Sequence, residues 1–290
     1  MTAAPAATFD YMPPSAEHAP DLYKPDGVAE RLHGLASIGA AELRSYKEDG
    51  FLAVEDAFTP EEVCAGSEGL DHLMRGGKPD FKGLMFENAV RERFAELTAA
   101  ERFDAVRKLF EFVGHEARLN AMAAHAKLLA AVSKLMGGRQ PQLFQDMALV
   151  KPARIGREKP WHQDNAYFNY APGTPVIGVW IAIDEATQAN GCMHVWRGGH
   201  LEGARLHFKR RDWQICDTDM FANRKTVLAV PLKPGGALFF SGLLPHGTPT
   251  NHSPLRRRAV QFHYAPADAV KVAEAERLKL FGSEGKDVTC

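Results

Sequence analysis

The chain has 290 residues, 45% of them hydrophobic, which is enough material for one large domain or two smaller ones. Its formal net charge is −1, so the molecule has no overall field that would attract nucleic acid or an anionic membrane, and we expect neither as a partner. The sequence contains no apolar run of about 18 residues, which argues against a transmembrane helix.

The N-terminus and the cysteines indicate the compartment. The first twenty residues, "MTAAPAATFDYMPPSAEHAP", lack the basic start and apolar centre of a signal peptide, and we predict that residues 1–25 form a flexible arm. The cysteines form no C-x-x-C pair, which argues against a zinc ribbon or a disulfide framework and favours a reducing, cytoplasmic setting. They are Cys64, Cys192, Cys216 and Cys290.

Residues 30–140 are predicted to be mostly helical and to support the rest of the chain. "GAAELRSYKEDG" has helical spacing and ends at Gly50, and "FLAVEDAF" after it is typical of a short strand. Thr59 is a predicted helix N-cap, with Pro60 at the first helical position. Residues 98–135 are rich in Ala, Leu, Glu, Lys and Arg, and they predict two further helices.

The pattern then changes, and residues 140–270 are predicted to form a β-core. The segments "QLFQDMALVKP", "VIGVWIAIDE", "GCMHVWRG", "TVLAVPLK", "GALFFSG" and "RRAVQFHYAP" are short, rich in β-branched or aromatic residues, and bounded by turn residues. Such spacing predicts an antiparallel sandwich or barrel of the jelly-roll, cupin-like kind. No linker divides the chain, so we expect residues 1–290 to form a single, mainly β domain with the N-terminal helices packed against its core.

The stretch "KPWHQDNAYFNY", residues 159–170, contains a candidate pair of metal ligands. On a strand, alternate side chains point the same way, so His162 and Asp164 would share one side while Gln163 points to the other. An imidazole nitrogen and a carboxylate at this spacing can hold one metal ion. The alternative is a surface histidine and aspartate beside a turn, because an isolated H-x-D pattern is short.

A second histidine comes from "GALFFSGLLPHGTPTNHSPLRRRAVQFHYAP". A predicted strand runs into a short loop that presents His246, and the next strand carries Arg257. Period-two alternation places Arg257 on the same strand face as Gln261 and His263. A candidate ligand and a cation therefore arrive together at the end of a strand.

Four segments together resemble the phytanoyl-CoA dioxygenase family of Fe(II)- and 2-oxoglutarate-dependent oxygenases. They are "YKEDGFLAVEDAFTPEEV", "WHQD", "VWIAIDEATQANGCMHVWRGGH" and "LLPHGTPTNHSPLRRRAVQFHY", and in this order they cover roughly residues 43–265. The resemblance implies a double-stranded β-helix, a jelly-roll whose open mouth holds the metal. Two imidazoles and one carboxylate on one face of an octahedral ion leave the opposite positions open, as in non-haem Fe(II) oxygenases.

The resemblance also implies roles for individual residues. His162, Asp164 and His246 would bind the iron, and their catalytic role would be exerted through it. Arg257 falls at the position that binds the distal carboxylate of 2-oxoglutarate, for which a planar guanidinium suits both oxygens. Its rivals for this role are Arg256 and Arg258.

Two further residues match positions of the co-substrate pocket in that family. Thr248 matches a hydroxyl that assists 2-oxoglutarate, and Trp180 matches an aromatic residue that lines the pocket. The alternatives, an ordinary loop threonine and an ordinary core tryptophan, stay open.

The candidate substrate-binding residues lie either directly after His162 and Asp164 in the sequence or on the predicted strand before them. Asn165, Tyr167 and Phe168 would lie at the rim of the pocket, with packing at an edge strand as the alternative. Gln145 and Lys151 lie on the preceding predicted strand and could face the cavity.

A charged segment and three further histidines lie outside these candidate sites. Residues 201–224 are charged and poor in turn residues, which predicts a mobile lid over the mouth. His194, His200 and His263 are interpreted as histidines of the core or of loops rather than as ligands.

The expected activity is hydroxylation of an unactivated C–H bond in a small organic substrate by O₂, coupled to conversion of 2-oxoglutarate to succinate and CO₂. By the same resemblance, Asp164 fills the position that related halogenases leave open for chloride, which favours hydroxylation. Desaturation or cyclisation by the same oxidant stays open. The alternative function is a metal-binding jelly-roll without oxygenase turnover, either a binding or sensing module or a hydrolase. We expect a monomer or a homodimer.

Overall fold

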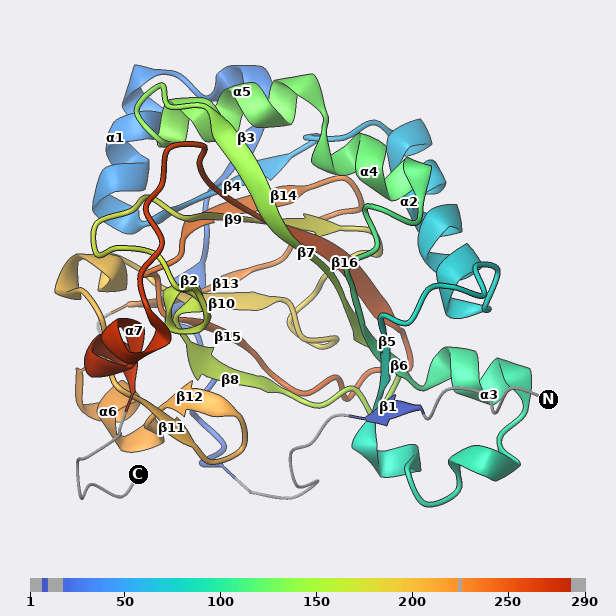
Figure 1. Cartoon of the computed structure of the whole chain (residues 1–290). Coiled ribbons are helices and arrows are strands. Elements are labelled where there is room, and N and C mark those ends of the chain that lie inside the picture. Colours follow the sequence, from blue (N-terminus) through green and yellow to red (C-terminus); the bar gives the residue numbers. More distant parts are fainter. Residues whose placement is uncertain (1–6, 10–17, 224–225, 283–290) are drawn as a thin grey trace.

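Two β-sheets lie face to face at the centre of the molecule (Figure 1). The structure is a computed structural model, and it describes residues 7–9, 18–223 and 226–282. Within these ranges the larger sheet runs β1 (Thr8–Phe9), β5 (Leu84–Phe86), β6 (Val106–Phe110), β7 (Pro141–Lys151), β16 (Arg257–Pro266), β9 (Ile177–Ala182), β14 (Ala237–Ser241), β4 (Phe51–Glu55) and β3 (Arg31–His33). The smaller sheet runs β2 (Gly27–Val28), β13 (Val227–Val230), β10 (Met193–Trp196), β15 (His246–Thr248) and β8 (Lys159–His162).

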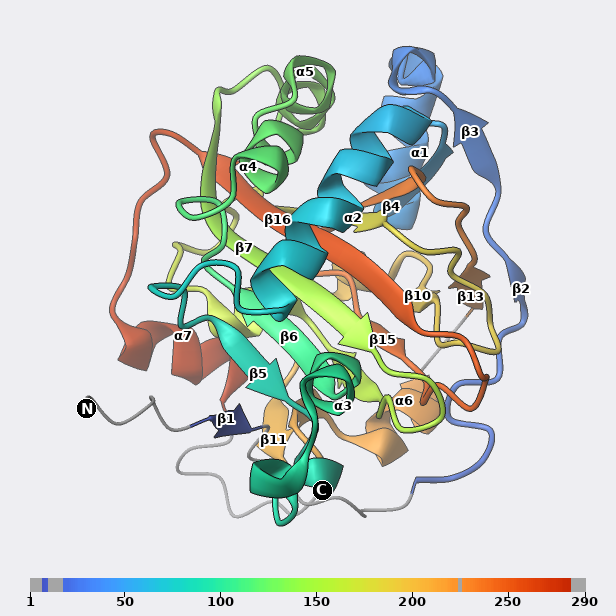
Figure 2. The ribbon, with the colours of Figure 1, turned by 90° about the vertical axis from the view of Figure 1, so that its right-hand side faces the viewer.

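Helices cover the outer face of the larger sheet, onto which Figure 2 looks. They are α1 (Ala40–Asp49), α2 (Pro60–Met74), α4 (Ala117–Ala123) and α5 (Ala126–Leu135). As predicted, α2 begins with Thr59 as N-cap, whose hydroxyl accepts from the Glu62 amide while the Glu62 carboxylate accepts from the Thr59 amide. Helix α1 ends at Gly50, where φ is 86° and a side chain would be strained.

The remaining elements lie at the periphery. They are the hairpin β11 (His207–Lys209) and β12 (Trp213–Ile215), the helices α3 (Ala99–Asp104), α6 (Asp217–Asn223) and α7 (Glu274–Phe281), and the 3-10 turns η1 (Leu35–Ser37), η2 (Asn88–Val90), η3 (Phe94–Glu96), η4 (Asp164–Tyr167) and η5 (Gly199–Glu202).

Three apolar layers hold these elements together. The largest packs the helices on the outer face of the larger sheet, and the second fills the space between the sheets with residues such as Trp180 and Phe240. The third covers the outer face of the smaller sheet, where Trp161 and Trp196 pack with Leu22. Each face of both sheets is therefore buried, which explains why strands such as β9 and β10 are buried along their whole length.

The six β-segments predicted after residue 140 all form strands, as does "FLAVEDAF". Residues 98–135 were predicted as two helices, and this is wrong at β6, which pairs with β5 and β7 in the larger sheet. Helix-favouring residues such as Arg107 and Lys108 enter a strand here because the free edge of β7 offers backbone partners, and tertiary pairing overrides local propensity.

Part of the segment expected to be a flexible arm is packed. Residues 8–9 pair with β5, and the side chains of Leu22 and Tyr23 are buried against the smaller sheet. Residues 1–6 and 10–17 lie outside the described ranges.

The cysteines differ from one another. Cys64 and Cys192 carry free thiols, whereas Cys216 is disulfide-bonded. The lack of a C-x-x-C pattern was interpreted as evidence against disulfides, and this is wrong at Cys216, because disulfides depend on tertiary proximity rather than on sequence spacing. Cys290 lies outside the described residues. Among the helices that the structure describes, none is both long and apolar enough to cross a membrane.

Candidate metal centre and its cavity

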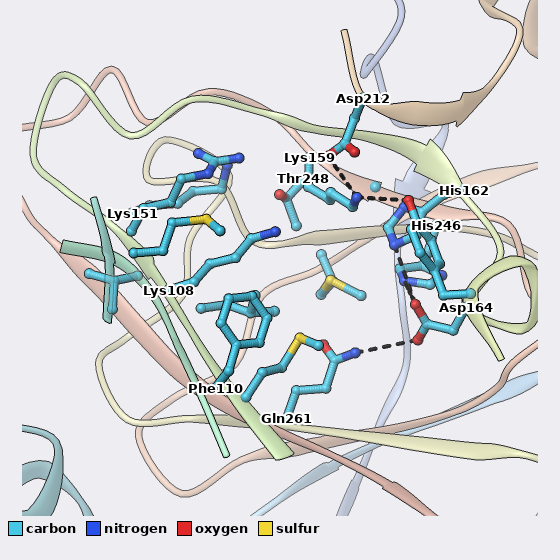
Figure 3. Close-up of a pocket in the computed structure, with 18 of the residues that line it drawn as sticks. Lys108, Phe110, Lys151, Lys159, His162, Asp164, Asp212, His246, Thr248 and Gln261 are labelled. Carbon is cyan, nitrogen blue, oxygen red and sulfur yellow. Dashed lines mark hydrogen bonds and ion pairs between the residues drawn. The ribbon is translucent and has the colours of Figure 1, made fainter. Parts of the chain in front are cut away.

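His162, Asp164 and His246 converge at one point between the sheets (Figure 3). All three are buried, and one ligand atom from each lies within 4.8 Å of the others. The Oδ1 atom of Asp164 is 3.4 Å from Nε2 of His162 and 3.6 Å from Nε2 of His246. His162 is the last residue of β8, and Asp164 is the first residue of the turn η4. The two side chains point to the same site, as predicted, although only the histidine lies on a strand.

Strand pairing and backbone carbonyls fix the two imidazoles. His162 and His246 are direct cross-strand partners in the antiparallel pair β8–β15. Nδ1 of His162 donates to the Pro160 carbonyl at 2.7 Å, and Nδ1 of His246 donates to the Leu244 carbonyl at 2.9 Å. With the proton held on Nδ1, each ring directs the lone pair of Nε2 toward the site, which is the arrangement a metal ligand requires.

The electrostatics suit a divalent transition metal. Burial lowers the pKa of His246 to about 3, and burial together with Lys159 lowers the pKa of His162. Burial alone would raise the pKa of Asp164, but His246 and His263 hold it well below its usual value. At neutral pH the three groups are therefore two neutral imidazoles and one carboxylate, the deprotonated set that binds such an ion.

Gln163, between the two ligands, points away from the site and anchors it. Its amide nitrogen donates to the carbonyls of Gly203 at 2.8 Å and Leu243 at 2.6 Å, and its oxygen accepts from the Arg205 amide at 2.8 Å. Its backbone amide donates to Nε2 of His207 at 3.0 Å. The ligand pair is thus attached both to residues 203–207 and to the loop before the third ligand.

The two ends of the described chain brace the same segment. Tyr23 stacks on Trp161, next to His162, with ring centroids 5.9 Å apart. From α7, Arg277 donates to the Ala166 carbonyl and, at 2.8 Å, to the side chain of Asn169.

The segment 201–224, predicted to be a mobile lid, is held by buried ion pairs. Arg211 pairs with Glu158 at 2.5 Å and with Asp217, and Glu158 also accepts from the Tyr23 hydroxyl. Lys159 pairs with Asp212 at 2.7 Å. These contacts argue against the predicted mobility of residues 201–223; residue 224 lies outside the described ranges.

A cavity of about 270 Å³ opens beside the three ligands, between β6, β7 and β16 of the larger sheet and β8, β10 and β15 of the smaller one. Much of its wall is apolar, formed by Met85, Phe110, Met147, Leu149, Phe168 and Met193. Six cationic side chains also line it, namely Arg107, Lys108, Lys151, Arg157, Lys159 and Arg257, against the carboxylates of Asp164 and Asp212. The cavity is therefore suited to an anionic ligand.

The structure brings most of the predicted site residues to this cavity but not all. Those that line it are Gln145, Lys151, Tyr167, Phe168, Thr248 and Arg257. Asn165 does not, because its side chain lies against Gly242, where a Cβ atom would come within 2.1 Å of Asn165 Oδ1. Trp180 does not line the cavity either; its ring lies 5.2 Å from the guanidinium carbon of Arg257 and supports that side chain from below.

Arg257 is a buried cation without a carboxylate partner in the described part of the chain. Its guanidinium donates to the carbonyls of Leu149 at 3.0 Å and Gly191 at 3.2 Å, and its Nε has no hydrogen-bond partner among the residues that the structure describes. Burial lowers its pKa to about 10. A buried, uncompensated guanidinium is costly, so an anionic ligand beside it would be strongly favoured.

The two rival arginines are engaged elsewhere. Arg256 lies near Asp104 at 3.3 Å, and Arg258 pairs with Asp184 at 2.7 Å and Asp71 at 2.6 Å. Of the three neighbouring arginines, Arg257 is the one that lines the cavity.

Several residues that line the cavity have little or no signal in the sequence. Lys108 and Phe110 lie on β6, which the sequence did not predict as a strand. Lys159, three residues before the first ligand, donates to the Tyr167 hydroxyl at 3.0 Å at the mouth. Gln261 was placed on the face of Arg257 by period-two alternation, and this was the one available sign that it reaches the cavity.

A family model described as phytanoyl-CoA dioxygenase (PhyH) matches residues 46–259 of the chain, well over half of it. The chain belongs to this family. The mouse protein "phytanoyl-CoA dioxygenase domain-containing protein 1" is 24% identical over 268 residues, covering 80% of this chain and 92% of the relative.

Solved structures show the same fold. EctD from S. alaskensis with bound Fe matches with a TM-score of 0.65 and 22% identity, covering 81% of this chain and 80% of that one. The epimerase SnoN in complex with Fe³⁺, alpha-ketoglutarate and nogalamycin RO matches with a TM-score of 0.64 and 17% identity, covering 87% and 93%. The family match confirms the expected family and its dioxygenase class, and these neighbours confirm the jelly-roll fold.

His207 gives this PhyH-family chain a specific sensitivity to acid. Burial lowers the pKa of His207 to about 3, so between about pH 6.5 and pH 3 the unfolded chain binds a proton that the folded chain does not. Stability present above about pH 6.5 is therefore lost as the pH falls, by about 2 kcal/mol at pH 5 for this one residue. Urea unfolding of the chelator-treated protein at pH 7 and pH 5 will measure the loss. His207→Gln should reduce the difference by that amount, and an unchanged difference would contradict the assignment.

Proposed function

We propose that this chain is an Fe(II)- and 2-oxoglutarate-dependent dioxygenase that hydroxylates an unactivated C–H bond of a small organic substrate and forms succinate and CO₂. The observation that carries the proposal is the presence, in one cavity, of the buried His162–Asp164–His246 group and the uncompensated cation Arg257. A metal-binding module without turnover would have no use for this second feature.

The residues of the metal centre fit Fe(II). Nε2 of His162, Oδ1 of Asp164 and Nε2 of His246 would hold the ion on one face. Bound there with 2-oxoglutarate and O₂, it would supply the oxidising power that an unactivated C–H bond requires. The protein contributes ligands in the correct protonation state, fixed by the Pro160 and Leu244 carbonyls.

Arg257 and Thr248 would bind the co-substrate. The guanidinium of Arg257 can present parallel N–H groups to the distal carboxylate of 2-oxoglutarate, while Trp180 supports its plane. Thr248 is buried beside the cavity and follows His246 by two residues, so its hydroxyl can donate to the same carboxylate. These contacts orient the keto-acid end of the co-substrate toward the three ligands.

The rest of the cavity would hold the substrate. Its volume of about 270 Å³ lies near the lower end for ligand sites, which favours a small molecule that occupies the space left by the co-substrate. Tyr167 and Phe168 at the mouth and Gln145 on β7 are proposed to contact it. Lys151 also lines the cavity, but its ammonium donates to the Arg157 carbonyl at 2.5 Å, so its stem offers the contact.

The location and assembly of the protein stay predictions from the sequence. We expect a cytoplasmic monomer or homodimer that acts on a small molecule and binds neither nucleic acid nor membrane.

Turnover of 2-oxoglutarate tests the proposed function. The purified protein with Fe(II), ascorbate and a panel of small metabolites should form succinate, and the accepted substrate should gain one oxygen atom by mass spectrometry. His246→Ala should abolish both, because two ligands cannot hold the ion in this geometry. Absence of succinate across the panel, with iron bound, would favour the metal-binding alternative.

Arg257 provides a separate test of co-substrate binding. Arg257→Gln should raise the KM for 2-oxoglutarate roughly 10- to 150-fold, the effect of losing a charge-assisted hydrogen bond worth about 1.5–3 kcal/mol. Metal affinity should stay unchanged, because Arg257 contacts none of the three ligands. The matched control is Arg256→Gln, one residue away and outside the cavity, which should leave the KM at its original value. Equal effects of the two substitutions would contradict the assignment.

A further inference from the structure

The oxygen of Asp164 that faces away from the two ligand histidines is bound by a pair of buried side chains. Oδ1 is the atom close to His162 and His246, whereas Oδ2 contacts Nε2 of His263 at 2.7 Å and Nε2 of Gln261 at 3.3 Å. Figure 3 shows the amide of Gln261 directed at the carboxylate. The two oxygens of one side chain therefore have separate surroundings.

The chemistry of these contacts fixes the hydrogen positions. An ionised carboxylate only accepts, so Nε2 of His263 must carry a proton and donate it to Oδ2. The Gln261 amide nitrogen, which lies 3.1 Å from the same imidazole nitrogen, must then also donate to Oδ2. Nδ1 of His263 is buried and has no partner among the described residues, which is consistent with a single proton, on Nε2.

His263 is held in place by aromatic rings. It is fully buried, and its ring lies 4.8 Å from that of Phe168, 6.0 Å from that of Phe144 and 6.5 Å from that of Phe240. Its partner across the β16–β9 pair is Gly178, where a Cβ atom would come within 2.4 Å of the Phe240 ring. The imidazole is thus enclosed and cannot turn away from Asp164 without rearranging this cluster.

We propose that His263, assisted by Gln261, is a positioning residue that limits Asp164 to binding the metal through Oδ1 alone. The inference rests on the proposed function, because it concerns the iron that His162, Asp164 and His246 would hold. Carboxylates bind metals through one oxygen or through both. If Oδ2 also bound, it would occupy a position that the co-substrate or O₂ needs, and two donors on Oδ2 oppose this.

Strand β16 supplies both parts of the arrangement. Arg257, Gln261 and His263 share one face of it by period-two alternation, and the first and last are six positions apart. The strand that presents the co-substrate cation at one end therefore presents the donors to Asp164 further along, so both are fixed in one rigid element.

The test uses Co(II) as a spectroscopic substitute for Fe(II) in the chelator-treated, full-length protein. His263→Leu, which removes the donor, should weaken Co(II) binding about 10- to 100-fold, the usual effect of losing a hydrogen-bonding partner of a ligand. It should also change the visible absorption of the Co(II) complex, because a second carboxylate oxygen would enter the coordination sphere. His263→Gln places an amide donor near the position of Nε2 and should restore both the affinity and the spectrum.

His194→Leu is the matched control, since His194 is a buried histidine on β10 that contacts none of the three ligands. It should leave both Co(II) readouts unchanged, whatever its effect on stability. Wild-type affinity and spectrum in folded His263→Leu would overturn the inference while the proposed function stands. Failure of the unsubstituted protein to bind Co(II) would overturn both.

A second variant covers the case in which His263→Leu does not fold. Gln261→Leu removes the weaker donor from the same oxygen, and it should lower Co(II) affinity several-fold, with a smaller change in the spectrum. An affinity and a spectrum identical to those of the unsubstituted protein would count against the inference.

Discussion

The pairing of β8 with β15 is the constraint on which the site depends. It sets His162 directly opposite His246, so that two imidazoles 84 residues apart in the sequence share one face of the smaller sheet. A slip of one residue would turn one of these rings to the opposite face and separate the pair. Gln163 secures the register, because its side chain bonds both the loop before His246 and residues 203–205.

The cationic side chains that line the cavity differ in whether a carboxylate neutralises them. Near the mouth, Lys159 is neutralised by Asp212, and on the wall Arg107 is neutralised by Glu87 at 3.0 Å. Arg257 differs from these two cations, because among the described residues its guanidinium contacts carbonyl oxygens and the Trp180 ring rather than a carboxylate. The uncompensated charge of Arg257 therefore lies where the family resemblance places the carboxylate of the co-substrate.

The sequence predicted those features that depend on local spacing. Short, turn-bounded segments predicted the order of strands after residue 140, whereas the complete ligand triad and Arg257 were expected from the resemblance to the phytanoyl-CoA dioxygenase family; the structure places these four residues at one cavity. The prediction failed at β6, because pairing with β7 overrides the helical preference of Arg107 and Lys108. It also left out the roles of Gln163 and His263, since their hydrogen-bonding partners are distant in the chain: His263 reaches Asp164 across 99 positions. Asn165 was placed at the rim by its position beside a ligand, but the turn η4 directs its side chain away.

The segment that carries His162 and Asp164 is supported by residues from early and late parts of the chain, which affects the order in which the centre is completed during synthesis. Tyr23 stacks on Trp161, the residue before His162, and Arg277 donates to the turn that contains Asp164. Synthesis proceeds from the N-terminus, so α7 leaves the ribosome after all three ligands, and the support from Arg277 is added only after the ligands have been made. A truncated product that ends before Arg277 would contain all three ligands but would lack the hydrogen bonds that hold the turn of Asp164 in place.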